Sequence, residues 1–569
     1  MHFPTTEPRK SLYYSYEVYP HFHSDVATLA DEQSVTVVGA GPIGMCTALL
    51  LAKQGVNVIL LSAEQQLSEG SRALVYTKRS MEILQAAGAA ERIMRRALPW
   101  THGNSIYKGQ VAFRMASPTH EHDQFAPLNN LQQNWLESYL LDTIQEHENI
   151  EVRWGNKVVD HEQHDDAVTL TIQTPEGEYQ HRTSWVVAAD GGRSPIRERM
   201  KLRMQGASYE GRFVIADIRI KLDYPTERLA FFSPDWNPGN TILMHREPDD
   251  IWRFDYQLDA DISSEAALQP ENLHKAVNDQ LKMIGQDHLE WEMDWSTVYS
   301  ARALTLDQYV HHRVMFVGDA AHLLPIFGVR GANTGFQDAQ DLAWKLSAVV
   351  KKWAPQKLLE SYTFDRVGAV REIIAEAGKS TRFMAPPTDG FRLLRNAVLS
   401  LSLEHEFVRP LYHWRTSRPH AYTHSPLNSQ YDDNSQMNEW TENGALIPNV
   451  KDAQGEFLYD VISAKSSILV LTEKGQITAG LLTEVTQLKT QGIPVQLVAL
   501  AIDGEEASCA DLTFKINHEI AQQRFYADAG AIYLVRPGHH INGRWLGYHE
   551  NALLNTFNQF THASKGVAA

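Results

Sequence analysis

Cysteine is scarce in this chain of 569 residues. Only Cys46 and Cys509 occur, and they lie far apart in the sequence. Two isolated thiols exclude a disulfide framework and any chemistry that needs a redox-active cysteine pair. The low cysteine usage fits a reducing compartment. Because the first 31 residues contain no apolar signal core, we expect a cytoplasmic protein.

Long apolar runs and an excess of positive charge are also missing. No segment approaches the roughly 20 apolar residues that a membrane-spanning helix needs. The formal net charge of −17 argues against a nucleic-acid-binding face, which would be basic, and it disfavours an anionic membrane surface. We therefore expect neither a membrane nor a nucleic acid as a partner.

Several catalytic motifs are absent as well. The chain has no His-Glu-x-x-His, no phosphate-binding P-loop and no Gly-x-Ser-x-Gly elbow. Its paired histidines lie too close in sequence for ordinary ligand spacing on a helix, and we interpret them as surface residues: His120 and His122, His311 and His312, His539 and His540. We expect no metal site, and phosphoryl transfer and serine hydrolysis are disfavoured.

A glycine-rich turn near the N-terminus lies between predicted elements. The pattern predicts a buried parallel strand at 34–38, a helix at 45–54 and a second strand at 56–61. In the turn between the first strand and the helix, Gly39 permits the tight bend, Gly41 lets backbone approach a pyrophosphate, and Gly44 lets helix and strand pack closely. The helix N-terminus would face the phosphates. The alternative is a strand–helix turn that binds nothing.

A carboxylate that holds a ribose hydroxyl is expected at the end of the second strand. Ser62 occupies that position, and Glu64 follows two residues later. Either Glu64 reaches the ribose or Ser62 binds it more weakly, and both alternatives stay open.

Two further motifs follow along the chain. Asp190-Gly191-Gly192 precedes Arg193 and Arg197, whose guanidinium groups suit phosphates, although a solvated helix start is an equal alternative for Arg197. Asp319 lies in a Gly-Asp-Ala-Ala turn, where its carboxylate can accept from a sugar hydroxyl; alone, it could equally cap a helix. Beyond it, a loop with little side-chain bulk suits a planar ring, because it contains Pro325, Gly328 and Gly331.

The length of the chain predicts two to four domains. Alternating runs such as Ile251 to Gln257 predict antiparallel strands with one solvated face, and the Pro, Asn, Asp and Ser content after residue 417 predicts a linker or a long loop. The expected organisation is an N-terminal extension (1–33), a nucleotide-binding segment (34–200), an antiparallel-sheet domain (201–298), a second nucleotide-binding segment with a helical region (299–416), the linker (417–455) and a small α/β domain (456–569).

Together these motifs resemble those of the single-component FAD-dependent aromatic hydroxylases. The glycine, Asp190 and Asp319 motifs occur in the family's order, and Gly70-Ser71-Arg72-Ala73 is similar to its second FAD-contacting stretch. Gln133 to Glu137 is similar to its Gln-x-x-Leu-Glu helix, and residues 327–346 give the most specific match. The resemblance covers most of the chain and points to the 3-(3-hydroxyphenyl)propionate hydroxylase-like branch, which is related to phenol hydroxylase.

The resemblance implies an α/β fold with three parts. These are a Rossmann-like FAD-binding domain, an inserted antiparallel-sheet domain that covers the substrate, and a C-terminal thioredoxin-like domain. Because this last domain has Cys509 but no Cys-x-x-Cys, it cannot exchange dithiols, and a structural or homodimer-supporting role is expected. The implied FAD-binding residues are Gly39, Gly41, Pro42, Ile43, Gly44, Ser62, Glu64, Arg72, Gln133, Asp190, Asp319, Pro325, Gly328, Gly331, Ala332 and Asn333.

The resemblance also implies the chemistry. NADPH or NADH would reduce FAD, O2 would add to the reduced flavin as a C4a-hydroperoxide, and one oxygen would pass to a phenolic or hydroxyaromatic-acid substrate. Two alternatives remain: Baeyer–Villiger oxidation or epoxidation of a non-phenolic substrate, and a non-catalytic FAD-binding protein. The two isolated cysteines exclude a flavin disulfide reductase.

No motif identifies the group that activates the phenol. Candidates in the predicted substrate domain are Tyr256, Arg253, His245 and Tyr299, and Tyr76 is a further candidate beside the second FAD-contacting stretch. Each of these is more often an ordinary sheet residue, so the catalytic residue stays open at this point.

Overall fold

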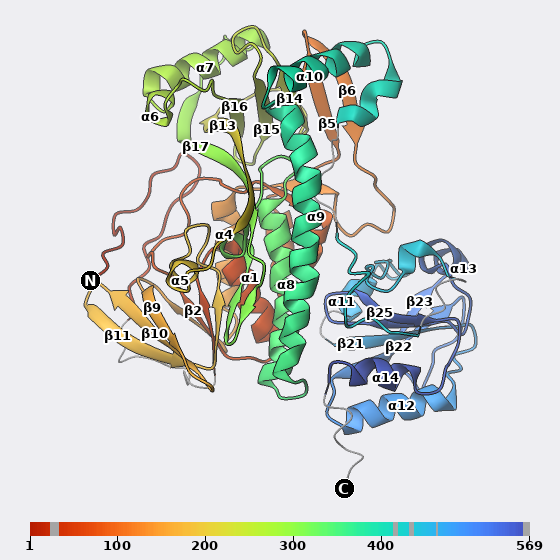
Figure 1. The fold of residues 1–569 in the computed structure, drawn as a ribbon. Helices are drawn as coiled ribbons and strands as arrows, with labels where there is room; N and C mark the ends of the chain where they lie inside the picture. Colours follow the sequence, from red (N-terminus) through yellow and green to blue (C-terminus); the bar gives the residue numbers. More distant parts are fainter. Residues whose placement is uncertain (23–33, 413–418, 432–436, 463–464, 562–569) are drawn as a thin grey trace.

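A computed structural model of the chain describes residues 1–22, 34–412, 419–431, 437–462 and 465–561. Figure 1 shows a parallel-sheet domain, an antiparallel-sheet domain above it and a C-terminal domain to one side. Two long helices, α8 (Gly331–Val350) and α9 (Glu360–Met384), run side by side through the middle, and α9 extends to the antiparallel sheet.

The predicted βαβ unit is confirmed and lies at the centre of the parallel sheet. β1 (Val35–Val38) pairs with β2 (Val58–Leu61) on one side and with β12 (Trp185–Ala188) on the other, and α1 (Pro42–Lys53) connects β1 to β2. The strands are apolar and fully buried, as expected for a parallel sheet covered on both faces. The full order is β18 (Val310–His311), β19 (Val314–Phe316), β12, β1, β2, β8 (Ile150–Arg153), with only β18 antiparallel.

The register of this sheet brings four separate turns to one edge. Val38 pairs with both Ala188 and Leu61, and Ala188 pairs in turn with Phe316, so the carboxyl ends of β1, β12, β2 and β19 are level. The turns that follow these strands contain Gly39–Gly44, Asp190, Ser62 and Asp319. Ligands of open parallel sheets bind at this edge.

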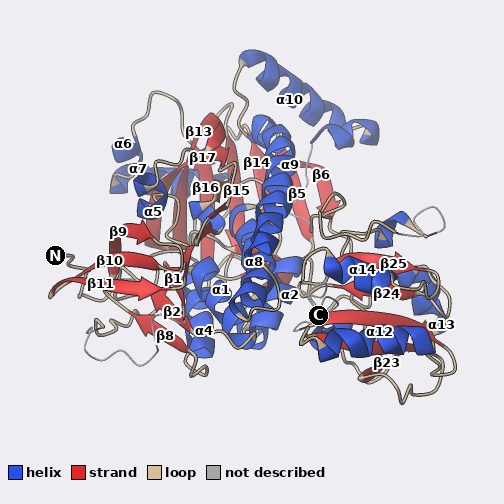
Figure 2. Cartoon of the chain, turned by 60° about the horizontal axis from the view of Figure 1, so that its bottom comes forward, coloured by secondary structure: helices blue, strands red, loops and turns tan. Residues whose placement is uncertain are grey.

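Smaller elements complete this domain. α1 is covered by α2 (Lys78–Ala87), α4 (Gln133–Ile144) and α8. Figure 2 shows one three-stranded sheet at the outer side of the domain, formed by β9 (Lys157–Gln163), β10 (Val168–Thr174) and β11 (Gly177–Thr183). The remaining elements are a second small sheet of β3 (Val75–Thr77), β7 (Leu128–Asn130) and β4 (Leu98–Trp100), with α3 (Ala90–Met94) and α5 (Pro195–Arg199).

The antiparallel-sheet domain is larger than the predicted range 201–298. It has eight strands, and two of them, β5 and β6, come from residues 102–116 of the first nucleotide-binding segment. β5 (His102–Tyr107) pairs in parallel with β14 (Arg228–Phe232), and no local sequence pattern predicts a contact between such distant segments. The strand order is β20 (His322–Leu323), β17 (Glu292–Thr305), β13 (Gln205–Arg219), β16 (Ile251–Gln257), β15 (Thr241–Arg246), β14 (Arg228–Phe232), β5 (His102–Tyr107), β6 (Gln110–Ala116).

The prediction that this sheet has one solvated face is wrong. On β16, Trp252 and Phe254 join an apolar core with residues of α7 (Pro270–Met283) and of the short α6 (Ser264–Ala267). The alternate residues Arg253 and Asp255 are 3% and 6% exposed, because their face of the sheet is turned toward the segment that contains Arg72. Polar residues on this strand therefore mark a buried interior face.

The C-terminal domain has the predicted thioredoxin-like arrangement. Its sheet has the order β23 (Leu512–Ile516), β22 (Val495–Ile502), β21 (Ser466–Thr472), β24 (Ile532–Val535), β25 (Ile541–Trp545), with β21 to β23 parallel and β24 and β25 antiparallel. Its α-helices are α11 (Leu458–Ile462), α12 (Ala479–Thr490), α13 (His518–Ile520) and α14 (Ala552–Asn558).

The predicted linker is not an open connection where the structure describes it. Leu427, Ile447 and Val450 are buried in the cores of the C-terminal domain. His539 and His540 are also buried, His539 stacked on Tyr459 with ring centroids 3.8 Å apart, so their assignment to the surface is wrong. The polar composition of residues 417–455 reflects irregular backbone that packs against a sheet.

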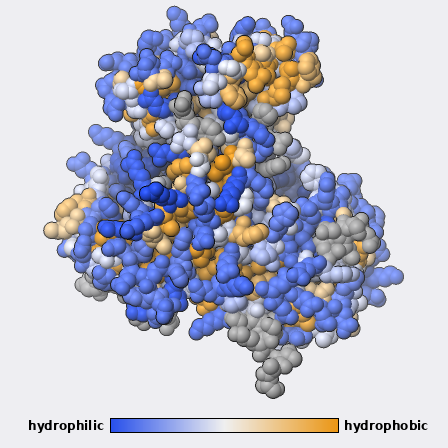
Figure 3. All heavy atoms as spheres, viewed as in Figure 1, coloured by the Kyte–Doolittle hydropathy of each residue, from blue (hydrophilic) through white to orange (hydrophobic). Residues whose placement is uncertain are grey.

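The N-terminal segment packs along both larger domains. Tyr19 stacks on Trp154 of the parallel-sheet domain, and Ser11 donates to Asp294 of β17 (2.9 Å). Within the described residues, no helix is long and apolar enough to cross a membrane. Figure 3 shows hydrophobic residues gathered over α10 (Asp389–Ser402), where Leu393 is 73% exposed.

Candidate functional site

Gly39 and Gly44 have the tight-turn and packing roles that the sequence predicted. Gly39 has φ +113°, and a Cβ on it would lie 2.3 Å from the Ala189 carbonyl oxygen. A Cβ on Gly44 would lie 1.9 Å from the Gly39 carbonyl oxygen, because helix and turn are in contact. A Cβ on Gly41, the N-cap of α1, meets no atom within 4 Å. Only Gly41 faces open space, next to a helix N-terminus that attracts anions.

Asp190 and Arg197 join two of the turns. Asp190 Oδ2 accepts from the Ile196 N–H (3.2 Å), while Asp190 Oδ1 is buried with no partner among the described atoms. Burial raises the pKa of this carboxyl. Arg197 donates to the carbonyls of Gly192 (2.7 Å) and Ala320 (3.0 Å). The solvated alternative for Arg197 is wrong, since the side chain holds the Asp190 turn against the Asp319 turn.

Asp319 presents an accessible carboxylate between two buried neighbours. It lies in a single 3₁₀ turn, Gly318–Ala320, whose other residues are buried. Gly318 packs on Ile43 of the glycine motif, so the two motifs are in contact. The charges of Arg72 and Arg197 act on the Asp319 carboxylate. This position suits a group that accepts from the hydroxyls of a bound ligand.

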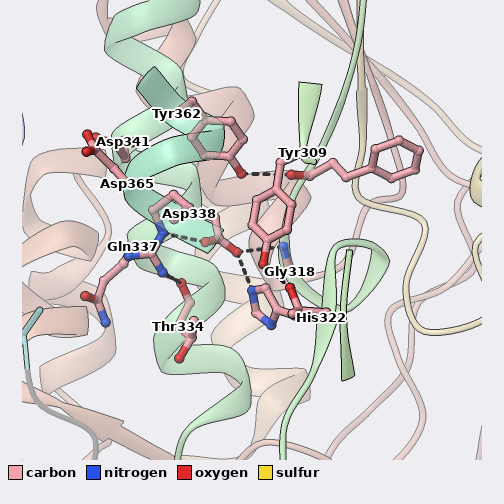
Figure 4. Close-up of polar contacts among 12 residues, drawn as sticks. Tyr309, Gly318, His322, Thr334, Gln337, Asp338, Asp341, Tyr362 and Asp365 are labelled. Atoms are coloured by element: carbon pink, nitrogen blue, oxygen red, sulfur yellow. Dashed lines mark hydrogen bonds and ion pairs between the residues drawn. The ribbon is translucent and has the colours of Figure 1, made fainter. Parts of the chain in front are cut away.

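A buried ion network fixes this turn from behind (Figure 4). Asp338 on α8 accepts from His322 Nε2 (2.6 Å), Arg366 Nε (2.7 Å) and the Gly318 N–H (3.0 Å), and it is fully buried. Burial alone would raise the pKa of Asp338, but the charges of His322 and Arg366 hold this pKa below its usual value. Arg366 also donates to Tyr422 Oη (2.8 Å), beyond α9. Sequence reasoning missed this network, because each of these hydrogen bonds joins residues that are 16 to 56 positions apart.

The loop between Pro325 and Gly331 is held in a strained conformation. Val329 has φ +54°, which β-branched residues rarely adopt. Asn333 Nδ2 donates to the carbonyls of Val329 (2.7 Å) and Val75 (2.8 Å), and Asn333 Oδ1 accepts from Thr77 and Ser80. Asn333 therefore positions the loop with its side chain. Gly331 begins α8, and a Cβ there meets nothing within 4 Å.

The segment around Arg72 is held by Gln133 and Arg253. Gln133 Oε1 accepts from the Ala73 N–H (3.0 Å), and Arg253 donates to the carbonyls of Ser71 and Arg72. The Arg72 side chain itself is exposed. The predicted FAD-contacting stretch thus lies between the parallel-sheet domain and the antiparallel sheet.

Ser62 and Glu64, the two candidates for the ribose contact, differ in burial and in their partners. Ser62 is buried at the end of β2, and its backbone pairs with Arg153 and Asn156. Glu64 is half-exposed and pairs with Arg9 of the N-terminal segment (3.7 Å). The assignment of either residue to the ribose stays a prediction, with Ser62 nearer the glycine turn in the sheet register.

The five candidates for phenol activation separate clearly. Tyr256 faces the apolar core against Trp236, on the far side of the sheet, so it is not a site residue. Tyr76 donates to the Ala73 carbonyl (3.1 Å) and Tyr299 to the Leu324 carbonyl (3.0 Å), which makes them supports of site loops. Arg253 is bound by Asp217 through both carboxylate oxygens (2.8 and 2.9 Å). His245 is the cross-strand partner of Arg253, so it lies on the same face of the sheet.

One group of described residues brings metal-ligating atoms together. His120, Glu121 and His122 have ligand atoms within 4.8 Å of one another. Nδ1 of His120 accepts from the His122 N–H, and Nδ1 of His122 accepts from the Lys451 N–H, which places the ring protons on Nε2. A metal at Nε2 would have to displace both protons. The absence of a metal centre stays a prediction.

Comparison with known proteins decides the family. Residues 32–377, more than half of the chain, match the family described as FAD binding domain. The chain belongs to this FAD-binding family. Similar proteins include a 3-(3-hydroxy-phenyl)propionate/3-hydroxycinnamic acid hydroxylase of Burkholderia cenocepacia, 28% identical over 65% of this chain and 67% of the relative. A para-nitrophenol 4-monooxygenase of Pseudomonas sp. is 29% identical over 58% of this chain and 82% of the relative.

Solved structures of the same fold cover the C-terminal domain as well. The flavin-dependent monooxygenase PieE, in complex with FAD and substrate, has a TM-score of 0.76 at 19% identity and covers 92% of this chain and 99% of its own. Aklavinone-11 hydroxylase has a TM-score of 0.73 at 21% identity, with 94% and 99% covered. The predicted three-part fold is therefore confirmed.

The residues present fit the FAD that this family binds. Gly41 and Gly331 leave open space beside the N-termini of α1 and α8, the Asp190 carboxylate has a buried oxygen without a partner, and the Asp319 carboxylate is accessible. A pyrophosphate at a helix N-terminus and hydroxyls that donate to carboxylates are the contacts that such groups make.

Proposed function

We propose that this chain is an NAD(P)H- and FAD-dependent monooxygenase that hydroxylates a phenolic or hydroxyaromatic-acid substrate. The proposal rests on the convergence of the Gly41, Asp190 and Asp319 turns at one edge of the parallel sheet. It is supported by relatives that are named as hydroxylases of 3-(3-hydroxy-phenyl)propionate and of para-nitrophenol.

Each part of FAD has a candidate holder. The N-terminus of α1 at Gly41 would take the pyrophosphate, Ser62 or Glu64 the ribose, and Asp319 the ribityl hydroxyls. The loop from Pro325 and the N-terminus of α8 would hold the carbonyl oxygens of the ring. When bound, FAD supplies electron transfer from NAD(P)H and the activation of O2.

The chain's own residues close the site from the opposite side. Arg253 fastens the Ser71–Arg72 segment to β16, and Tyr299 fastens the Leu324 carbonyl to β17. An aromatic substrate would lie between this sheet and the ring and would displace water from there. Exclusion of water limits the loss of reducing equivalents to peroxide.

The test measures oxidation of NADH and NADPH by the purified yellow protein with a panel of phenols and phenolic acids. Peroxide and product are quantified in the same samples. Faster oxidation with one phenol, matched by a hydroxylated product and little peroxide, is expected. A lactone or epoxide would instead indicate a non-phenolic oxygenation, and no stimulation by any aromatic compound would contradict the proposal.

Location and assembly belong to the same proposal. A cytoplasmic protein agrees with two cysteines that are both unpaired. A homodimer stays a prediction, and analytical ultracentrifugation of the FAD-loaded protein measures it directly.

A further inference from the structure

Three charged or titratable side chains on the interior face of the antiparallel sheet each have an atom without a hydrogen bond. Among the described atoms, Asp255 Oδ1, His245 Nδ1 and Arg228 Nε are buried with no hydrogen-bond partner. Buried polar groups are nearly always paired, so unpaired ones in a binding region mark atoms that a ligand satisfies. These three come from adjacent strands, β16, β15 and β14.

The three side chains form one cluster. His245 Nε2 lies 3.7 Å from Asp255 Oδ2, and the two residues are 3% and 6% exposed. The charge of Arg228 acts on both Asp255 and His245, and its guanidinium lies 5.8 Å from the centre of the Trp100 ring. The cluster therefore offers a carboxylate, a neutral acceptor or donor, and a cation side by side.

The cluster lies next to the two segments that are proposed to contact the flavin. Arg253, two residues before Asp255 on the same face of β16, donates to the Ser71 and Arg72 carbonyls. Leu243, the cross-strand partner of Asp255, packs in a cluster with Phe327 of the loop from Pro325 to Gly331. Asp255 thus lies between the two segments that would flank the flavin ring.

Asp255 differs from Asp217, a second carboxylate on this face. Asp217 has both oxygens bound by Arg253 and is a structural partner of that arginine. Asp255 has no such hydrogen-bonded partner for Oδ1. A carboxylate that is buried, uncommitted and adjacent to a cation is equipped to exchange a proton with a ligand.

We propose that Asp255 accepts the proton of the substrate's phenolic hydroxyl and that Arg228 stabilises the phenolate so formed. This inference rests on the proposed function and deepens it, since it assigns the activating group. The phenolic O–H bond breaks, its electron pair stays on the oxygen, and the proton passes to Asp255. The proton returns to the hydroxylated product, so Asp255 ends the cycle ionised.

The surrounding charges suit this role. Burial raises the pKa of Asp255 to about 7, although the charges of Arg253 and Arg228 act in the opposite direction. Burial, together with Arg228 and Arg253, lowers the pKa of His245 well below its usual value, so His245 stays neutral. The groups that face Asp255 are Asp217 on β13, Arg228 on β14, His245 on β15, Glu247 after β15, and Arg253 on β16. Below about pH 7 Asp255 becomes protonated and cannot accept the proton.

The test compares Asp255→Asn with wild type in two ways. First, oxidised, FAD-loaded protein without NAD(P)H is titrated at about pH 8 with 3-(3-hydroxyphenyl)propionate, and the phenolate difference absorption of the bound ring is measured. Second, kcat/KM is measured for this weakly acidic phenol and for the more acidic para-nitrophenol. The control is Glu292→Gln, an exposed carboxylate on the same sheet that pairs with Arg219.

The expected result is a phenolate band in wild type and in the control, and none in Asp255→Asn. The loss in kcat/KM should be about 10²-fold or more for the weakly acidic phenol and less than about 10-fold for para-nitrophenol, which ionises without a base. An unchanged band in Asp255→Asn, or equal losses for both phenols, would overturn the inference and leave the proposed function standing. Failure of every phenol of the panel to bind wild type would overturn both.

Wild type alone gives a second test, independent of how the variant folds. The kcat/KM for the weakly acidic phenol should fall as pH decreases through about 7, the pKa of Asp255. A profile that stays flat down to about pH 5 would overturn the role of Asp255.

Discussion

Replacing Asp338 with asparagine tests how the Asp319 turn is held. The amide keeps the shape of the side chain but removes the charge that Arg366 and His322 share, and it leaves Arg366 buried without its carboxylate. Removing one partner of a buried ion pair typically costs about 3–5 kcal/mol. For a domain of a few hundred residues this corresponds to a fall in Tm on the order of 10 °C.

The assay is thermal unfolding of the FAD-loaded protein, followed through the fluorescence of released flavin. Because Gly318 donates to Asp338 Oδ2, the variant should also release FAD at lower denaturant concentration. Asp307→Asn is the control, since Asp307 pairs with Arg371 at the surface and such pairs contribute about 0–1 kcal/mol. If Asp338→Asn unfolds within about 1 kcal/mol of the control, the network does not hold the turn.

The interaction of Asp338 with His322 and Arg366 also makes the free energy of unfolding depend on pH, with a defined sign. The folded-state pKa of Asp338 lies below its usual value, so its contribution to stability is fully present above the ordinary aspartate range near ~4. This contribution is lost as pH falls below that range. Wild type should therefore lose stability on acidification more steeply than Asp338→Asn, as measured by denaturant unfolding at several pH values; parallel curves would contradict this assignment.

Three further changes test other parts of the structure. Gly41→Ala should fold but bind FAD more weakly, because the added Cβ meets no atom of the protein within 4 Å and faces the proposed pyrophosphate position. Gly44→Ala should misfold, because its Cβ would lie 1.9 Å from a carbonyl oxygen. Circular dichroism measures the folding of each variant, and flavin absorbance measures the bound FAD. Arg79→Met removes donors to the Gly538 carbonyl and to Gln340, so cleavage between the domains by a protease should be faster, and an unchanged rate would argue against this contact. The native protein should show one reactive thiol, exposed Cys509, since Cys46 is buried and burial raises its pKa; two rapidly reacting thiols would contradict the packing of α1.

Much of the FAD-binding part could be predicted from the sequence, because its signals are local. Gly39, Gly41 and Gly44 are required by backbone geometry within one turn, and the strand, turn and helix follow one another directly. The motif order then indicated the family, which residues 32–377 confirm. A pattern confined to a few adjacent residues carries such information reliably.

The parts that sequence reasoning missed depend on contacts between distant segments. Alternation on β16 was correct as a strand signal, but nothing in it shows whether the face with Arg253 and Asp255 meets water or another domain. Tyr256 lies in the predicted substrate domain, but it is one residue away from Asp255 on the strand, so its side chain points to the opposite face. The hydrogen bonds of Asp338 to His322 and Arg366 join distant residues, so no local pattern predicts them.

The most direct test of the central claim is the origin of the oxygen atom in the product. The FAD-loaded protein is supplied with NAD(P)H and the phenol that stimulates its oxidation, under ¹⁸O₂ in unlabelled water, and the product is analysed by mass spectrometry. A monooxygenase predicts one labelled oxygen in the ring hydroxyl of each product molecule. Product without label, or NAD(P)H oxidation that yields only labelled peroxide, would contradict the claim.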